Sequence, residues 1–205
     1  MSKKKRKKTI IIFVSLLIIV SIILYFVLYK YNGNNKIVDK IDGYTYTLDD
    51  RDTDLVKSIF GELKTNLNSK EVDYVKYAES ISKLFVADLY TMQNKSNKYD
   101  VGGRDYIYPD HVDNYKLKVE DTLYLYLEDI STRKNNKDLP VVTEIEANFV
   151  EEGKFQYMDN EYSSYIVDLQ WEYEKNLGYD HSAKITVINI ENKLYIADFN
   201  VEVSE

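Results

Sequence analysis

The amino-acid sequence predicts an α+β domain that follows a single membrane-spanning helix. Three observations on the 205-residue chain lead to this prediction. An uncharged, strongly apolar segment occupies residues 9–29. Farther along, apolar residues recur every three or four positions up to about residue 128, and every second position after about residue 140. These periods are typical of amphipathic helices and of half-buried strands, so we expect about three helices packed on a curled four-stranded antiparallel sheet.

The segment 9–29 has the length and composition of a transmembrane helix. Of its 21 residues, 16 are Ile, Leu, Val or Phe. At about 1.5 Å per residue, a helix of this length covers the roughly 30 Å of a bilayer's hydrocarbon core. Six basic residues occupy positions 3–8. Because positive flanks stay inside, we expect residues 1–8 to be a basic cytoplasmic stub and the chain beyond residue 29 to lie outside.

A cleaved secretory signal peptide is the alternative interpretation of this segment. Its apolar run exceeds the about 7–15 residues usual in signal peptides, and no pair of small residues spaced for cleavage comes after it. We therefore expect a retained anchor whose partner is the lipid bilayer. The sequence predicts a single-pass protein of the cell membrane with an extracellular C-terminal domain.

Charge and cysteine content exclude several classes of function. Residues 31–205 contain 20 of the 27 basic side chains and all 34 acidic ones, a net charge of −14. Nucleic acid is therefore not an expected partner, because its binding depends on neutralising phosphates. The chain has no cysteine, which excludes disulfides, thiolate metal sites and cysteine nucleophiles.

The extracytoplasmic domain is expected over residues 51–205. Residues 30–50 before it are predicted to be a polar tether, with an edge strand at 44–48 where Tyr and Thr alternate. The first helix is predicted over 53–67, because Thr53 suits an N-cap and apolar residues occur after it at spacings of three and four.

Two more helices are predicted before the strands. The second covers 70–93, opens with a capping box of Asn68 and Glu71, and has an apolar stripe with Ser82 on the opposite face. The third begins at Pro109, which suits a first helical turn, and continues to about residue 128. The alternating residues at the end of this helix would suit a strand equally well.

Four strands then alternate apolar with mostly polar residues, around 141–149, 165–173, 183–187 and 195–203. One apolar face per strand is typical of an antiparallel sheet that is covered on one side. Hairpin turns are expected at Glu152-Gly153 and at Glu191-Asn192-Lys193.

The helix end at 84–90, the loop 100–109 and the four strands together resemble the cone-shaped nuclear transport factor 2-like superfamily over about residues 53–203. With the stub and the span, the layout is similar to the bitopic assembly components of bacterial conjugation and type IV secretion channels. The resemblance implies a protein-interaction or assembly module of the bacterial envelope, which binds envelope proteins or itself. It transfers no catalytic residue to this chain, and enzymatic activity is not expected.

Two sets of side chains are candidate sites. The first is expected to line a pocket inside the cone and consists of Phe85, Asp88, Trp171 and Tyr173. The second draws on the 20 tyrosines, a residue type enriched at protein interfaces, and consists of Tyr106, Tyr108, Tyr157 and Tyr162.

The two histidines, His111 and His181, each come directly after an aspartate at a predicted turn or helix start, so we expect them to have structural roles. No metal or cofactor is expected. Three hypotheses remain: an envelope assembly module, a small-ligand binding or sensing domain with an apolar pocket, and an enzyme. The enzyme hypothesis requires Asp88, as a general base, to lie close to one of the histidines.

Overall fold

The computed structural model describes residues 13–23, 36–133, 138–157 and 159–201. The chain divides into two compact units after Asn34. In the first unit, residues 13–23 are helical and all their side chains are exposed. Within the described ranges, no helix combines the length and the apolarity that crossing a membrane requires. The rest of the predicted span 9–29 and the basic stub lie outside the described residues.

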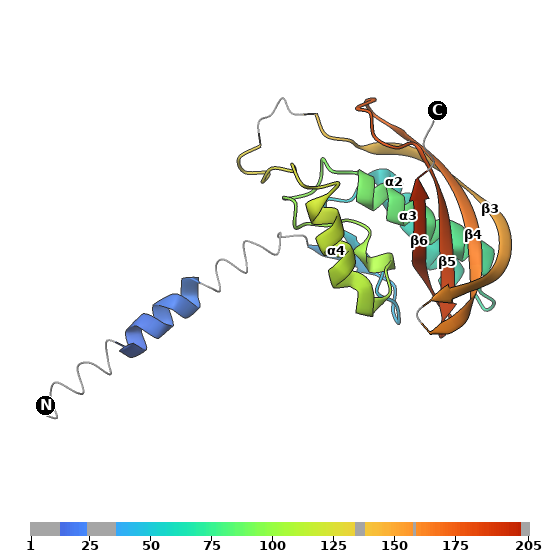
Figure 1. Cartoon of the computed structure of the whole chain (residues 1–205), viewed down its shortest axis with the longest axis horizontal. Helices are drawn as coiled ribbons and strands as arrows, with labels where there is room; N and C mark the ends of the chain where they lie inside the picture. The colour runs from blue at the N-terminus through green and yellow to red at the C-terminus, as the bar shows by residue number, and fades with distance from the viewer. Residues whose placement is uncertain (1–12, 24–35, 134–137, 158, 202–205) are drawn as a thin grey trace, which may run out of the picture. The chain divides into compact units, whose positions relative to one another are not determined.

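The second unit is an α+β domain with a four-stranded antiparallel sheet of order β3-β4-β5-β6, which confirms the predicted fold class. Figure 1 shows the long strands β3 and β4 curving around α3. The helices are α2 (Asp54–Leu67), α3 (Tyr74–Tyr90) and α4 (Val112–Asp121). The sheet strands are β3 (Val142–Tyr157), β4 (Asn160–Tyr173), β5 (Ser182–Ile190) and β6 (Lys193–Val201).

Residues 36–53 belong to the folded unit, whereas the sequence suggested a tether with an edge strand there. Strands β1 (Ile37–Lys40) and β2 (Thr47–Asp49) pair antiparallel as a separate two-stranded sheet. Ile41 and Tyr46, between the two strands, are buried in the core. The domain therefore begins earlier in the chain than apolar periodicity alone suggests.

Helices α2 and α3 each begin directly after a residue whose side chain caps the first turn. The Thr53 side chain caps α2 by accepting a hydrogen bond from the backbone of Val56, as predicted. The prediction that Asn68 and Glu71 form a capping box is wrong. Asn68 is the C-cap of α2, and α3 is capped instead by Asp73. Residues 68–73 form the connection between the two helices, so they cannot also be the first turn of α3.

Helix α3 is buried on more than its predicted stripe. Ser82, expected to face solvent, is completely buried, because α3 lies between α2 and the sheet and is covered on both sides. Helix α4 ends at Asp121 rather than near residue 128. The chain turns there because Tyr124 enters the core, where its hydroxyl donates to the carbonyl of Leu89 at 2.6 Å.

One predicted hairpin turn is confirmed and the other is wrong. Glu191 and Asn192 have positive φ angles of 54° and 65°, and they connect β5 to β6 as a two-residue turn of type I′. Glu152 and Gly153 instead lie inside β3, paired with β4. That hairpin turns near residue 159, so β3 is longer than its alternation predicted.

Bulges change the expected alternation in two strands. In β6, Ala197 is an extra residue between Ile196, paired with Val187, and Asp198, paired with Thr186. Ile196 is consequently packed in the core, and Tyr195 lies on the opposite face, whereas the sequence placed Tyr195 and Ala197 on the apolar face. In β3, a similar irregularity between Val142 and Glu144 brings Val142 into the core in place of Val141.

Candidate functional site

A cleft of about 470 Å³ opens between α3, α4 and β6. This volume is within the usual range of small-molecule pockets. Its walls combine aliphatic side chains with four aromatic ones, Phe85, Tyr90, Tyr115 and Phe199. Helix α3 supplies Phe85 and Tyr90 from successive turns, and the bulge in β6 sets the small residue Ala197 into the wall beside Phe199.

The polar end of the cleft is formed by Tyr90 and Asp180. The Tyr90 hydroxyl donates a hydrogen bond of 2.9 Å to the Asp180 carboxylate. Burial raises the pKa of Tyr90 well above its usual value, and the bond to Asp180 raises it further. The phenol is therefore a permanent donor, and it holds the carboxylate at the edge of the cleft.

Trp171 and Tyr173, predicted to line the pocket, lie behind Tyr90 instead. The Trp171 ring centroid is 5.3 Å from that of Tyr90, and its indole N–H donates to the Tyr173 hydroxyl at 2.8 Å. Tyr173 in turn donates to the backbone carbonyl of Asp180 at 2.8 Å. Both side chains therefore support the polar end of the cleft from the core, and of the predicted pocket residues only Phe85 lines it.

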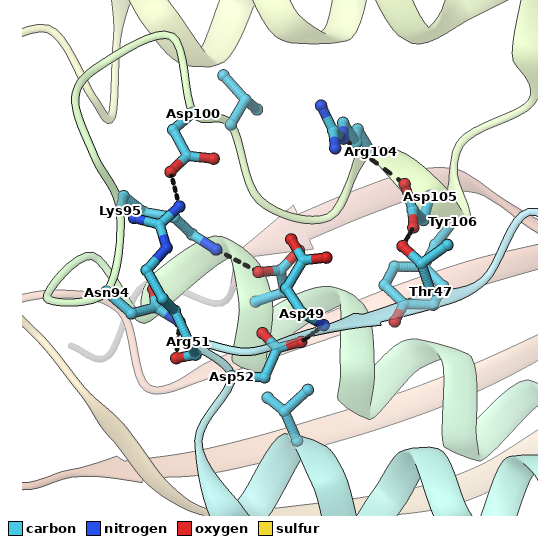
Figure 2. A pocket seen from close by; sticks show the side chains of 13 residues that line it. Thr47, Asp49, Arg51, Asp52, Asn94, Lys95, Asp100, Arg104, Asp105 and Tyr106 are labelled. Atoms are coloured by element: carbon cyan, nitrogen blue, oxygen red, sulfur yellow. Dashed lines mark hydrogen bonds and ion pairs between the residues drawn. The ribbon is translucent and has the colours of Figure 1, made fainter. Parts of the chain in front are cut away.

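Asp88 lies in a different place, a small charged cavity of about 30 Å³ shown in Figure 2. This space is sufficient for about one water molecule. The Asp88 carboxylate accepts hydrogen bonds from the ammonium group of Lys95 and, at 2.7 Å, from the backbone N–H of Gly103. Asp88 thus holds the loop after α3 against the end of that helix, and both of its oxygens have partners.

The lining of this cavity carries more negative than positive charge, with five aspartates against two arginines and one lysine. Arg51 pairs with Asp100 at 2.7 Å, and the Asp100 carboxylate also accepts from the backbone of Ser96. Burial alone would raise the pKa of Asp100, but the Ser96 N–H, Lys95 and Arg51 lower it overall. Burial and the negative charge of Asp88 raise the pKa of Asp52 to about 6.

Neither histidine contacts Asp88. The Nδ1 of His181 lies 3.1 Å from the Trp171 carbonyl, and the His111 ring packs on Tyr108 and Tyr157. Across the part of the chain that the structure describes, no group of three or more histidine or acidic side chains is arranged to hold a metal ion. The arrangement that the enzyme hypothesis required is not formed by these residues.

Three of the four predicted interface tyrosines converge. Tyr108 lies 6.3 Å from Tyr157, which lies 6.5 Å from Tyr162, measured between ring centroids. His111 and Tyr195 join them at 5.4 Å from Tyr157 and 5.3 Å from Tyr108. We call these five side chains the outer aromatic cluster. All except the buried Tyr195 are partly exposed.

The outer aromatic cluster forms because the loop that contains Tyr108 crosses the edge of the sheet at β6. Ile107 pairs with Ile196 as an isolated parallel bridge, which carries the next residues past β6. Tyr108 then reaches the face of the sheet opposite to the helices, where Tyr195 lies. Tyr106, only two residues earlier, is 3% exposed and stacks on Tyr46 in the core. It therefore does not belong to this surface.

Sequence reasoning missed Tyr90, Asp180 and the role of Ala197. Tyr90 lies outside the predicted stripe of α3, because at 3.6 residues per turn it shares a face with Lys83, seven positions earlier, so the helical period contained no signal for it. Asp180 precedes a strand within a loop and has the pattern of an ordinary turn residue. Its role depends on a partner 90 positions away, and nothing in the local pattern indicates that contact.

The fold and the site define an α+β domain with a cleft of small-molecule size and a separate aromatic surface. No protein-family model, curated protein or solved structure matches this chain.

Proposed function

We propose that this chain is a membrane-anchored binding module of the bacterial cell envelope, which recognises another protein through the outer aromatic cluster. The convergence of Tyr108, Tyr157 and Tyr162 with His111 is the observation that carries the proposal. Tyrosine combines apolar area with a polar hydroxyl and loses little conformational entropy on binding, so clusters of partly exposed tyrosines suit protein recognition.

Two features support the anchor and its orientation. The segment 9–29 is uncharged, and within it the described helix 13–23 exposes apolar side chains all round. A helix that is apolar on every side requires an apolar environment. The basic block at 3–8 favours a cytoplasmic N-terminus, and the lipid bilayer is then the first partner of the chain.

The order of predicted helices and strands in the sequence resembles the nuclear transport factor 2-like superfamily. Together with the predicted span, this resemblance suggests a conjugation or secretion channel component as the specific role. Envelope proteins, or a second copy of this chain, are the partners that such a role requires.

Membrane placement is tested with full-length protein that carries a C-terminal tag. We expect the protein to stay with membranes after carbonate extraction, and the tag to be digested by protease added to intact spheroplasts. Recovery in the aqueous fraction, or a tag protected from protease, would contradict the anchor or its orientation.

Protein recognition is tested by site-specific photo-crosslinking in cells. A photoreactive residue replacing Tyr157 or Tyr162 should give one discrete adduct, whose mass shows whether the partner is another protein or a second copy. The matched control replaces Tyr126, which is 82% exposed and lies outside the outer aromatic cluster. Equal crosslinking from the control position, or no adduct at either cluster position, would refute the proposed surface.

The cleft between α3, α4 and β6 favours a second candidate function, small-ligand binding or sensing. Its volume and its aromatic walls suit a ligand with an apolar body. Catalysis by Asp88 is not proposed, because Lys95 and the backbone of Gly103 occupy its carboxylate.

A further inference from the structure

We infer that the cleft between α3, α4 and β6 binds a small organic cation, an ammonium group attached to an aromatic or other apolar body. This inference gives a ligand class to the second candidate function. It does not depend on the outer aromatic cluster, which involves other residues.

The walls of the cleft supply aromatic surface for both parts of such a ligand. Phe85 lies 5.4 Å from Phe199 and 5.9 Å from Tyr115, between ring centroids, and Tyr90 lies 6.3 Å from Phe199. These rings form a continuous surface on which an apolar body can be buried. Aromatic faces also attract cations.

One fixed carboxylate gives the cleft its charge preference. Asp180 is held beside the aromatic rings by the Tyr90 hydroxyl, at 2.9 Å. Asp198 is on the opposite face of the sheet, where it pairs with Thr186 and accepts from Asn200. Among the described residues that line the cleft, Lys118 is the one cation; its side chain is exposed, as is that of Asp180. The carboxylate next to the rings, in a part of the chain (31–205) whose net charge is −14, favours a cation over an anion.

Ala197 leaves the space that the ligand would fill. The bulge places this residue in the cleft wall, and it is only partly buried. A larger side chain there would extend into the cleft without displacing a buried core residue. Ala197→Leu is therefore a variant that blocks the cleft and leaves the Asp180 carboxylate in place.

The experiment titrates the purified full-length chain with three probes of matched size: benzylammonium, benzyl alcohol and benzoate. Trp171 is the only tryptophan, and its contact with Tyr90 makes its fluorescence a readout of the cleft. We expect saturable binding of benzylammonium, with benzyl alcohol about tenfold weaker because it lacks the charge-assisted bond, and benzoate weaker still. Thermal stabilisation by benzylammonium gives an independent measure.

Two substitutions locate the binding. Asp180→Asn keeps an acceptor for Tyr90 but removes the charge, so it should weaken benzylammonium about tenfold and change benzyl alcohol little. The matched control is Asp168→Asn, at a carboxylate that pairs with Lys184 on the opposite face of the sheet. Ala197→Leu should abolish binding of both probes. If Asp180→Asn lowers the melting temperature, raising the ionic strength replaces it, and this should weaken benzylammonium but not benzyl alcohol.

Three outcomes would overturn the inference. They are benzoate binding more tightly than benzylammonium, equal effects of Asp180→Asn and Asp168→Asn, and undiminished binding by Ala197→Leu. A tighter benzoate would identify Lys118 as the main charge and an anionic ligand as the occupant. Each outcome is separable from failure of the proposed protein recognition, because crosslinking at Tyr157 reports on the other face of the sheet.

Discussion

The phenolic oxygens of Tyr46 and Tyr77 lie 2.7 Å apart in the core, and both bond to the backbone of Leu194. Tyr46 donates to the Leu194 carbonyl at 2.7 Å, and the Leu194 N–H donates to Tyr77 at 3.2 Å. Because Tyr46 has one hydroxyl hydrogen, Tyr77 must donate to Tyr46, which closes a ring of three hydrogen bonds. This ring gives hydrogen-bond partners to both backbone groups of Leu194, which lies on the edge strand β6. It also joins β6 to α3 through Tyr77 and to the segment before β2 through Tyr46.

Tyr46→Phe should therefore destabilise the domain. The substitution removes one oxygen from the ring, which leaves the Leu194 carbonyl and the Tyr77 hydroxyl buried without this partner. We expect a loss of about 1–3 kcal/mol in the free energy of unfolding, the usual cost of an unsatisfied buried group. Chemical denaturation monitored by tyrosine and tryptophan fluorescence measures it.

Tyr44→Phe is the control for this prediction. Tyr44 stacks on Tyr46 at 5.5 Å between ring centroids, but it is only partly buried. We expect its free energy of unfolding to change by less than about 0.5 kcal/mol. If the two variants lose equal stability, the ring of hydrogen bonds is not the cause.

The helices and strands were predictable because their apolar periods reflect burial directly. In β4, Val167, Leu169 and Trp171 alternate in the sequence and are all buried in the structure. Bulges were not predictable, because one extra residue leaves the composition unchanged and reverses the face on which the later residues of the strand lie. Ala197 shows this: its position depends on pairing with β5, which has no local signal.

The candidate site was predictable only in part for a similar reason. Tyr106 and Tyr108 are two residues apart in a loop, yet one is buried and the other belongs to the outer aromatic cluster. The bridge between Ile107 and Ile196 decides this difference, and it joins residues far apart in the chain. Residue type identified the tyrosines as interface candidates. Only long-range contacts determine which of them are buried and which lie on the surface.

Asp52→Asn should stabilise the domain at neutral pH. Burial raises the pKa of Asp52 to about 6 in the folded state, above the about 3.9 of an unfolded aspartate. A raised pKa means that this carboxyl stabilises the fold fully only below about pH 4, and that its contribution is lost as the pH rises to 6. Asparagine can still accept the 2.6 Å bond from the Asp49 N–H without ionising.

The expected gain from Asp52→Asn is on the order of 1–3 kcal/mol above pH 6, since each pKa unit corresponds to about 1.4 kcal/mol. The gain should vanish below about pH 4. Urea denaturation across this pH range measures it, with Asp42→Asn, whose side chain is 90% exposed, as the control. A pH-independent difference between Asp52→Asn and the natural chain would be inconsistent with this explanation.

Lys95→Met should be among the most destabilising single substitutions in the charged cavity. The Lys95 side chain is 7% exposed and pairs with Asp88, while Asp52 and Asp100 lie close enough to interact with its charge. Its removal leaves the Asp88 carboxylate without its paired cation, and breaking a buried pair costs about 3–5 kcal/mol. Because Lys95 also lowers the pKa of Asp52, that pKa should rise further in the variant.

A double-mutant cycle separates the ion pair from the loss of packing. Adding Asp88→Asn to Lys95→Met should cost much less than the sum of the two single changes, with a coupling of about 1–3 kcal/mol. Lys98→Met, at a partly exposed lysine whose ammonium group lies over the Tyr99 ring, is the control for Lys95→Met. Strict additivity of Lys95→Met and Asp88→Asn would show that the pair does not stabilise the fold.

Gly102→Ala and Gly61→Ala should change stability in opposite directions. A Cβ at Gly102 would lie 2.1 Å from the backbone oxygen of Asp88, a clash that only movement of the loop or of α3 can relieve. A Cβ at Gly61, inside α2, has no heavy atom within 4 Å. We expect Gly61→Ala to stabilise the domain by up to about 1 kcal/mol, the difference in helix propensity, and Gly102→Ala to destabilise it by more than that. Thermal unfolding of both variants tests this, and an unchanged melting temperature for Gly102→Ala would show that the loop does not approach the end of α3 as described.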